Sequence, residues 1–114
     1  MGEIVSLKKN RDFLKVYKRG KFFVGKFMVL YALPKRQDYT RAGITVSKKV
    51  GKSVTRNRLK RLIKENLKFY GFSIKNGYDL VFVARSNEKP SDFWEIKREM
   101  KFLLKKLGIM EHTE

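Results

Sequence analysis

Positively charged side chains gather in the middle of this 114-residue sequence, and the chemistry they offer is the binding of phosphate groups. Between positions 48 and 68, nine cations accompany a single acid, Glu65. The cations are Lys48, Lys49, Lys52, Arg56, Arg58, Lys60, Arg61, Lys64 and Lys68. Lysine and arginine at this density neutralise the backbone of a polyanion such as a nucleic acid. An ordinary solvated helix face is the alternative, but such a face would carry more acids among its cations.

Side chains suited to catalysis are scarce. His112 is the only histidine, and it lies in a tail that we expect to be mobile. The acids are scattered singly, whereas a two-metal nuclease needs several carboxylates at one point. There is no cysteine, which excludes disulfides and thiolate metal sites. Gly51–Ser53 reads GKS, but position 46 is Val46 instead of the first glycine of a phosphate-binding loop. We therefore expect a binding protein with no catalytic residue and no metal site of its own.

A helix must present these cations, and we expect it to begin at 53–56 and to end at Gly71. At about 100° per residue, one face collects the apolar residues and the opposite face collects the cations and Asn57. The apolar residues are Leu59, Leu62, Ile63, Leu67 and Tyr70. Cations near a helix N-terminus oppose the macrodipole, and like charges four residues apart repel. A polyanion along this face would remove both penalties.

Apolar patterns predict the elements that surround this helix. We expect a short helix over 11–19 capped by Asn10, strands over 27–33, 42–47 and 79–84, and a last helix from a cap at Ser91 or Asp92 to Gly108. Residues 109–114 should fray. The strands on either side of the basic helix form a βαβ unit whose relative direction the sequence leaves open. Residues 1–114 are thus expected to form one α+β domain, a two-layer sandwich of three helices on a sheet of three to four strands.

Two aromatic positions have more than one interpretation. Phe13 and Tyr17 are four residues apart and share one face of the first helix, where core packing is the simpler reading and base stacking is the alternative. Val16 and Leu14 point elsewhere, which is typical of a helix buried on more than one side. Trp94 lies outside the apolar stripe of the last helix and is expected to be a rim residue.

The overall charge supports a nucleic-acid partner. Lysine and arginine number 28 against 11 acids, which gives a formal charge of +17. A small domain needs a charge of only about 2–8 for solubility. An anionic membrane surface is the rival partner, but no segment approaches the roughly 18 apolar residues of a membrane span, and no signal peptide or lipidation motif is evident. We expect no membrane partner and a cytoplasmic location.

The residues from Ser47 to Glu65, SKKVGKSVTRNRLKRLIKE, resemble the signature of the bacterial ribonuclease P protein component. The centre of the resemblance is Arg56-Asn57-Arg58 followed by Leu59-Lys60-Arg61-Leu62. It extends to LKKNRDFLKVYKRGK at 7–21, to FMVLYAL at 27–33, and to the length and charge of the chain. Most of residues 7–107 are covered.

This resemblance implies a function and a set of sites. A member of this family binds a catalytic RNA as a monomer in a 1:1 complex, and the complex removes the 5′ leader of precursor tRNA with Mg²⁺ held by the RNA. The implied fold is an α/β sandwich whose βαβ crossover is left-handed. The implied contacts with the RNA subunit are Arg56, Asn57, Arg58, Lys60 and Arg61, and we expect the charged face of the same helix to add Lys64 and Lys68. A cleft between the first helix and the sheet would take the leader through Phe13, Tyr17, Val29, Tyr31, Lys48 and Lys49. Position 17 departs from the pattern, since Tyr17 stands where an apolar aromatic is usual.

Two other functions remain open at this point. The chain could be a structural RNA-binding protein of the ribosomal type with no part in cleavage, and composition alone does not separate this from a ribonuclease P subunit. A protein-only nuclease is disfavoured by the inventory of histidines and carboxylates.

Overall fold

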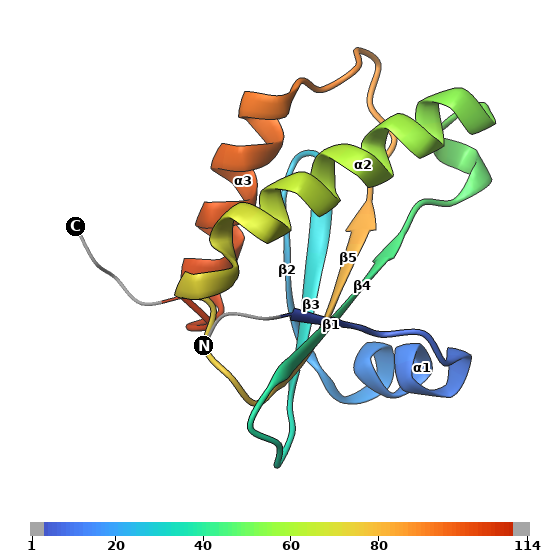
Figure 1. Cartoon of the computed structure of the whole chain (residues 1–114). Helices are drawn as coiled ribbons and strands as arrows, with labels where there is room; N and C mark the ends of the chain where they lie inside the picture. The colour runs from blue at the N-terminus through green and yellow to red at the C-terminus, as the bar shows by residue number, and fades with distance from the viewer. Residues whose placement is uncertain (1–3, 111–114) are drawn as a thin grey trace.

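The computed structural model describes residues 4–110, which form five strands and three α-helices joined by short loops and two 3₁₀ turns (Figure 1). In chain order the elements are β1 (Ile4–Ser6), α1 (Asn10–Arg19), β2 (Lys21–Val24), β3 (Met28–Pro34), β4 (Thr40–Thr45), η1 (Lys48–Val50), α2 (Ser53–Tyr70), η2 (Gly71–Ser73), β5 (Tyr78–Ala84) and α3 (Phe93–Lys106). The α+β class and the three predicted helices are confirmed.

The strands form a single mixed sheet in the order β1-β4-β5-β3-β2. β4 and β5 are parallel neighbours joined through α2, so the predicted βαβ unit is confirmed and its direction is now known. β3 runs antiparallel to both β5 and β2, and β1 runs parallel to β4. The sheet has five strands where three to four were expected, because β1 and β2 at the two edges are too short to show a periodic pattern. The left-handed crossover stays a prediction.

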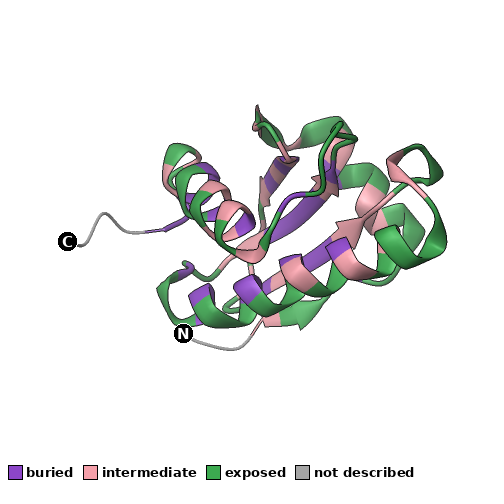
Figure 2. Ribbon diagram, turned by 90° about the horizontal axis from the view of Figure 1, so that it is seen from above, coloured by how far each residue is buried: buried purple, intermediate pink, exposed green. Residues whose placement is uncertain are grey.

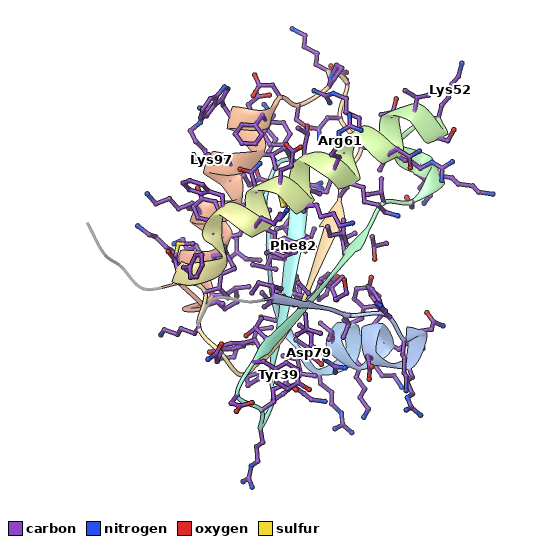
Figure 3. All side chains as sticks on the ribbon, in the orientation of Figure 1. Tyr39, Lys52, Arg61, Asp79, Phe82 and Lys97 are labelled. Atoms are coloured by element: carbon purple, nitrogen blue, oxygen red, sulfur yellow. The ribbon has the colours of Figure 1, made fainter. Side chains whose placement is uncertain are left out.

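Both faces of the central strands are covered, which explains why their sequences are apolar throughout. Alternate residues such as Leu30 and Phe82 are fully buried beneath α2 and α3, which lie on the same side of the sheet (Figures 1 and 3). Val81 points to the other face and is buried there with Val16 of α1. The buried positions concentrate along the strands and on the inner sides of the helices (Figure 2). The fold therefore leaves two surfaces available to bind a partner. One is the outer side of α2, and the other is the part of the α1-side face of the sheet that α1 does not cover.

The first helix differs from the prediction at its start and in its buried side. α1 begins at Asn10 itself, and Lys9 occupies the N-cap position without a side-chain hydrogen bond. Val16 is buried and Leu14 is about half exposed, so the helix is buried on the single side that carries positions 13, 16 and 17. Packing of this side against the sheet replaces the expected cap as the source of stability.

The carboxyl-terminal end of the described chain is also better ordered than predicted. Ile109 and Met110 are buried, the carbonyl of Ile109 accepts a hydrogen bond from Lys75 N at 2.9 Å, and Met110 forms an isolated β-bridge with Ile74. The expected fraying is wrong for these two residues, because the turn at Gly108, with φ of +72°, returns the chain to the core. Positions 111–114, including His112, lie outside the described residues.

The capping box predicted for the last helix is present. Glu95 N donates to Asp92 Oδ1 at 2.8 Å, and Asp92 N donates to Glu95 Oε1 at 3.0 Å. These reciprocal bonds satisfy two backbone donors that α3 would otherwise leave unpaired.

Replacing Asp92 with alanine should therefore lower the free energy of unfolding by about 1 kcal/mol. Urea denaturation of Asp92→Ala and Asp92→Asn checks this, since asparagine keeps an acceptor oxygen and should retain most of the stability. Equal midpoints for Asp92→Ala and the parent protein would show that the cap contributes nothing.

Candidate nucleic-acid interface

The helix α2 separates a buried side from a charged side, as its sequence predicts. Leu59, Ile63, Leu67 and Tyr70 are buried against the sheet and α3. Burial raises the pKa of the Tyr70 hydroxyl, which donates to the carbonyl of Lys97 in α3 at 3.1 Å. This bond fixes the position of α2 against its neighbouring helix.

The buried side of α2 contains one polar residue that the apolar pattern does not predict. Asn66 is fully buried, and its Nδ2 donates to the carbonyl of Leu62 at 3.0 Å. Leu62, expected on the buried face, is only half-buried. Asn66 follows Ile63 by three residues and precedes Tyr70 by four, so helical spacing places it on the buried side, where an apolar residue would be expected.

The opposite side of α2 carries all seven residues predicted to contact RNA. Five of them are exposed, namely Asn57, Lys60, Arg61, Lys64 and Lys68, and two are half-buried, namely Arg56 and Arg58. Arg56 Nε donates to the carbonyl of Gly51 at 3.2 Å and so ties the helix to the loop before it. Arg61 is visible on the outer side of α2 in Figure 3.

The charge on this cationic side, which we call the α2 cationic face, is not neutralised within the described part of the chain. The ion pairs among residues 4–110 join Lys35 and Arg41 to Asp12 and Asp79, and none involves α2. The first turn of α2 contains no acid, and its N-cap residue Lys52 makes no side-chain capping bond. Unpaired backbone N–H groups and cations therefore coincide at this end of the helix, an arrangement that attracts phosphate.

Arg41 of β4, which precedes the basic stretch, is bound by acids of the protein itself. Its guanidinium forms two hydrogen bonds with the buried carboxylate of Asp79, at 2.6 and 2.9 Å, and a longer one with Asp12 at 3.4 Å. Because the guanidinium donates these hydrogen bonds to the carboxylate of Asp79, the pKa of Arg41 is raised despite partial burial. Asp12 and Asp79 are far apart in the sequence, but the fold brings them together, and both bind the guanidinium of Arg41. Across residues 4–110 no three side chains of the types that bind metals gather at one point.

A second candidate surface lies on the face of the sheet that α1 partly covers. Tyr17 packs edge-on against Tyr31, with ring centres 5.1 Å apart, and its hydroxyl is 3.0 Å from Thr45 Oγ1. Val29 lies on the same face of β3, two residues before Tyr31, and is half-buried. The structure thus brings together Tyr17, Val29 and Tyr31, three of the residues that the resemblance assigns to the leader.

One further residue, Phe22, belongs to this surface and was not predicted from the sequence. Phe22 of β2 is 56% exposed and pairs with Tyr31 in the β2–β3 register, with ring centres 5.4 Å apart. Recognising it would have required reading residues 21–24 as an edge strand, in which Phe22 and Phe23 point to opposite faces. We call the group Tyr17, Phe22, Val29 and Tyr31 the α1-side aromatic surface.

Phe13 takes a more interior position than the other predicted leader contacts. It is half-buried in the cluster around Leu7, Val16 and Val81, and its ring lies directly over Gly43 of β4. A Cβ added to Gly43 would come within 2.6 Å of Phe13 Cε1. The absence of a side chain at Gly43 is therefore what lets α1 approach the sheet this closely.

Replacing Gly43 with alanine should lower the free energy of unfolding by about 1–3 kcal/mol, because the ring of Phe13 must move from its packed position. Chemical denaturation measures this change, and a double-mutant cycle with Phe13→Ala gives the matched control. Once the ring is absent, Gly43→Ala should cost almost nothing. The same cost in both backgrounds would show that Phe13 and Gly43 do not constrain each other.

The two lysines predicted at the edge of the leader site lie just beyond the sheet. Lys48 and Lys49 belong to η1 and are exposed. This turn begins three residues after Thr45, whose side chain contacts Tyr17. Because η1 leads directly into α2, it connects the end of the α1-side aromatic surface with the α2 cationic face.

None of the described helices is long and apolar enough to cross a membrane.

Comparisons with known proteins identify the family and agree with the fold. A model of the family described as Ribonuclease P matches residues 1–108. The chain is 51% identical over 104 residues to a ribonuclease P protein component of Clostridioides difficile (90% of this chain and 91% of that protein), and 47% identical over 109 residues to one of Clostridium kluyveri (94% and 97%). The solved ribonuclease P protein of Staphylococcus aureus superimposes with a TM-score of 0.86 at 33% identity, covering 96% of this chain and 100% of that one. For the Thermotoga maritima protein the TM-score is 0.80 at 33% identity, covering 89% and 96%. The chain with the α2 cationic face belongs to the ribonuclease P protein family.

Proposed function

We propose that this chain acts as the protein subunit of ribonuclease P by binding two RNAs on two separate surfaces. The α2 cationic face holds the catalytic RNA subunit, and the α1-side aromatic surface holds the 5′ leader of precursor tRNA. The observation that carries the proposal is the line of cations along α2, which no acid in the described chain pairs with. Membership of the ribonuclease P protein family indicates that one partner is the ribonuclease P RNA.

Binding along α2 rests on phosphate neutralisation. In the free protein the cations repel one another and oppose the helix dipole, so an RNA backbone laid along the helix gains from removing both penalties. Arg58 and Arg61 present planar guanidinium groups, which suit bidentate contacts with phosphate oxygens. Affinity for the RNA subunit should therefore fall steeply with salt.

Leader binding rests on one exposed ring, that of Phe22, and two half-buried rings, all of them near cations. Tyr17, Phe22 and Tyr31 form a contiguous platform on which the bases of an unpaired strand can stack, and stacking tolerates any base sequence. Lys48 and Lys49 stand where the strand would leave this platform. Tyr17, where the family usually has an apolar aromatic, keeps a ring for stacking, while its hydroxyl is already engaged by Thr45.

We assign the cleavage chemistry and its Mg²⁺ to the RNA subunit. This assignment follows the family resemblance, and it agrees with the commitment of Asp12 and Asp79 to Arg41. The protein would contribute by increasing the affinity for the substrate. By neutralising closely spaced phosphates, it would also lower the Mg²⁺ concentration needed for cleavage. A 1:1 complex of one protein with one RNA in the cytoplasm completes the proposal.

Reconstitution with a bacterial ribonuclease P RNA tests this function. At low Mg²⁺, adding the protein should stimulate cleavage of precursor tRNA at the mature 5′ end. Absence of stimulation, with RNA binding intact, would favour a structural RNA-binding protein. Cleavage by the protein without RNA would point to a protein-only nuclease instead.

A further inference from the structure

A third surface, between α2 and α3, is used by neither of the two proposed RNA contacts. Phe69 of α2 and Trp94 of α3 are 61% and 60% exposed, and Lys97 of α3 lies between them. We call these three residues the Phe69–Trp94 patch. Single exposed apolar residues are common, but large rings gathered at one place on a surface mark an interaction site.

The patch is held in a defined geometry. Lys97 Nζ lies 3.8 Å from the centre of the Phe69 ring and 5.3 Å from that of Trp94. The backbone of Lys97 is fixed to α2 through the hydrogen bond from buried Tyr70. Phe93 supports Trp94 edge-on, with ring centres 5.1 Å apart. The rings are therefore positioned before any partner arrives, which reduces the entropy lost on binding.

The charges around the patch favour an anionic partner. Lys101 follows Lys97 one helical turn later in α3. The acids of α3 are engaged elsewhere, because Glu95 belongs to the capping box and Glu99 accepts hydrogen bonds from the backbone N–H groups of residues 26–28 at 2.7–2.8 Å. On α2 the neighbouring acid is Glu65, one turn before Phe69. Rings interleaved with lysines match a nucleotide, which offers an aromatic base and a phosphate together.

The patch is also continuous with the α2 cationic face. Phe69 follows Arg58 by eleven residues, which at about 100° per residue returns to within roughly 20° of the same direction around the helix. α2 and α3 lie side by side on one face of the sheet (Figure 1), and both Arg61 and Lys97 are on the outside of this layer (Figure 3). An RNA that follows the cations of α2 toward its carboxyl end therefore reaches Phe69.

We propose that unpaired nucleotides of the catalytic RNA subunit stack on Phe69 and Trp94, with their phosphates bound by Lys97 and Lys101. This inference rests on the proposed function, because the RNA is the one assigned to α2. In the complex, Lys97 moves from the Phe69 ring to a phosphate, and a base takes its place on the ring.

Trp94 provides a local readout, since it is the only tryptophan of the chain. The intact protein is titrated with a bacterial ribonuclease P RNA while tryptophan emission is recorded, and a gel-shift assay measures assembly independently. Emission should be quenched in step with assembly, and acrylamide should reach Trp94 less easily in the complex. Precursor tRNA and a perfect RNA duplex should produce much less quenching at equal phosphate concentration.

Two variants that leave the charge of the chain unchanged measure the contribution of ring stacking to RNA binding. Phe69→Leu, which keeps an apolar side chain, should weaken binding of the ribonuclease P RNA about fivefold or more. The matched control is Phe72→Leu, since Phe72 is 80% exposed but lies outside the patch, and its effect should stay below twofold.

Several outcomes would overturn the inference. Assembly without a change in Trp94 emission would leave the proposed function standing and remove this contact, and continued access of acrylamide would direct the search to a protein partner. If duplex RNA quenched Trp94 emission as strongly as ribonuclease P RNA does, the quenching would report the nearby phosphate charge and not base stacking. If precursor tRNA quenched it as strongly, the patch would be a contact for the substrate. Failure to assemble at all would overturn both the inference and the proposed function.

Discussion

Replacing Arg58 and Arg61 together with alanine should weaken binding of the ribonuclease P RNA by roughly 50-fold at about 0.1 M salt. Each phosphate contact contributes about 0.9 to the slope of log affinity against log salt on duplex-like RNA, so losing two contacts should reduce this slope by about 1.8. The two guanidinium groups share the α2 cationic face, and no acid within the described chain pairs with them. Filter binding over a series of salt concentrations measures both the affinity and the slope.

A matched pair of substitutions controls for the loss of net charge. Arg36 and Lys75 are exposed cations in the loops before β4 and before β5, away from the α2 cationic face. Arg36→Ala with Lys75→Ala removes the same two charges and should leave the slope nearly unchanged. Equal losses for the two pairs would mean that the RNA responds to overall charge, and α2 would lose its assigned role.

The second large effect concerns the leader. Replacing Phe22 and Tyr31 with leucine removes two adjacent rings and keeps apolar side chains, which limits damage to the sheet. Since stacking contributes about 1–3 kcal/mol per base, precursor tRNA with a leader should bind the assembled complex about 10- to 100-fold more weakly. Mature tRNA should bind as before, because it has no leader to contact the α1-side aromatic surface.

Phe72→Leu, which alters an exposed ring in η2 just after α2, is the control for this variant. Equal weakening for precursor and mature tRNA would show that Phe22 and Tyr31 support the fold and do not contact the leader. A comparison with Phe13→Ala is informative, because Phe13 packs over Gly43 and should affect stability as well as binding.

The prominent helices and the binding side of α2 were predictable because their patterns repeat over several turns. Leu59, Ile63, Leu67 and Tyr70 recur at helical spacing over an 18-residue helix, which identifies both the buried and the charged sides. Asn66 has the same helical spacing, three residues after Ile63, but its polar side chain kept it out of a prediction based on apolar residues.

The features that were missed depend on strand register and on contacts between distant residues. β1 and β2 contain three and four residues, which is too short for alternation to be recognised. Without β2, the pairing of Phe22 with Tyr31 is invisible. The link from Arg41 to Asp12 and Asp79 spans 29 and 38 positions of the chain. The register of β4 beside β5 brings Arg41 to Asp79, and the packing of α1 on the sheet brings Asp12 to Arg41.

The central claim is that the α2 cationic face binds the RNA subunit and the α1-side aromatic surface binds the leader. One comparison tests it directly. The affinities of the reconstituted complex for precursor and for mature tRNA are measured with the parent protein, with Arg58→Ala/Arg61→Ala, and with Phe22→Leu/Tyr31→Leu, at protein concentrations that saturate the RNA subunit. The α2 variant should keep the preference for precursor once assembled, and the aromatic variant should lose it while assembling normally. Loss of the preference in both variants, or in neither, would contradict the account.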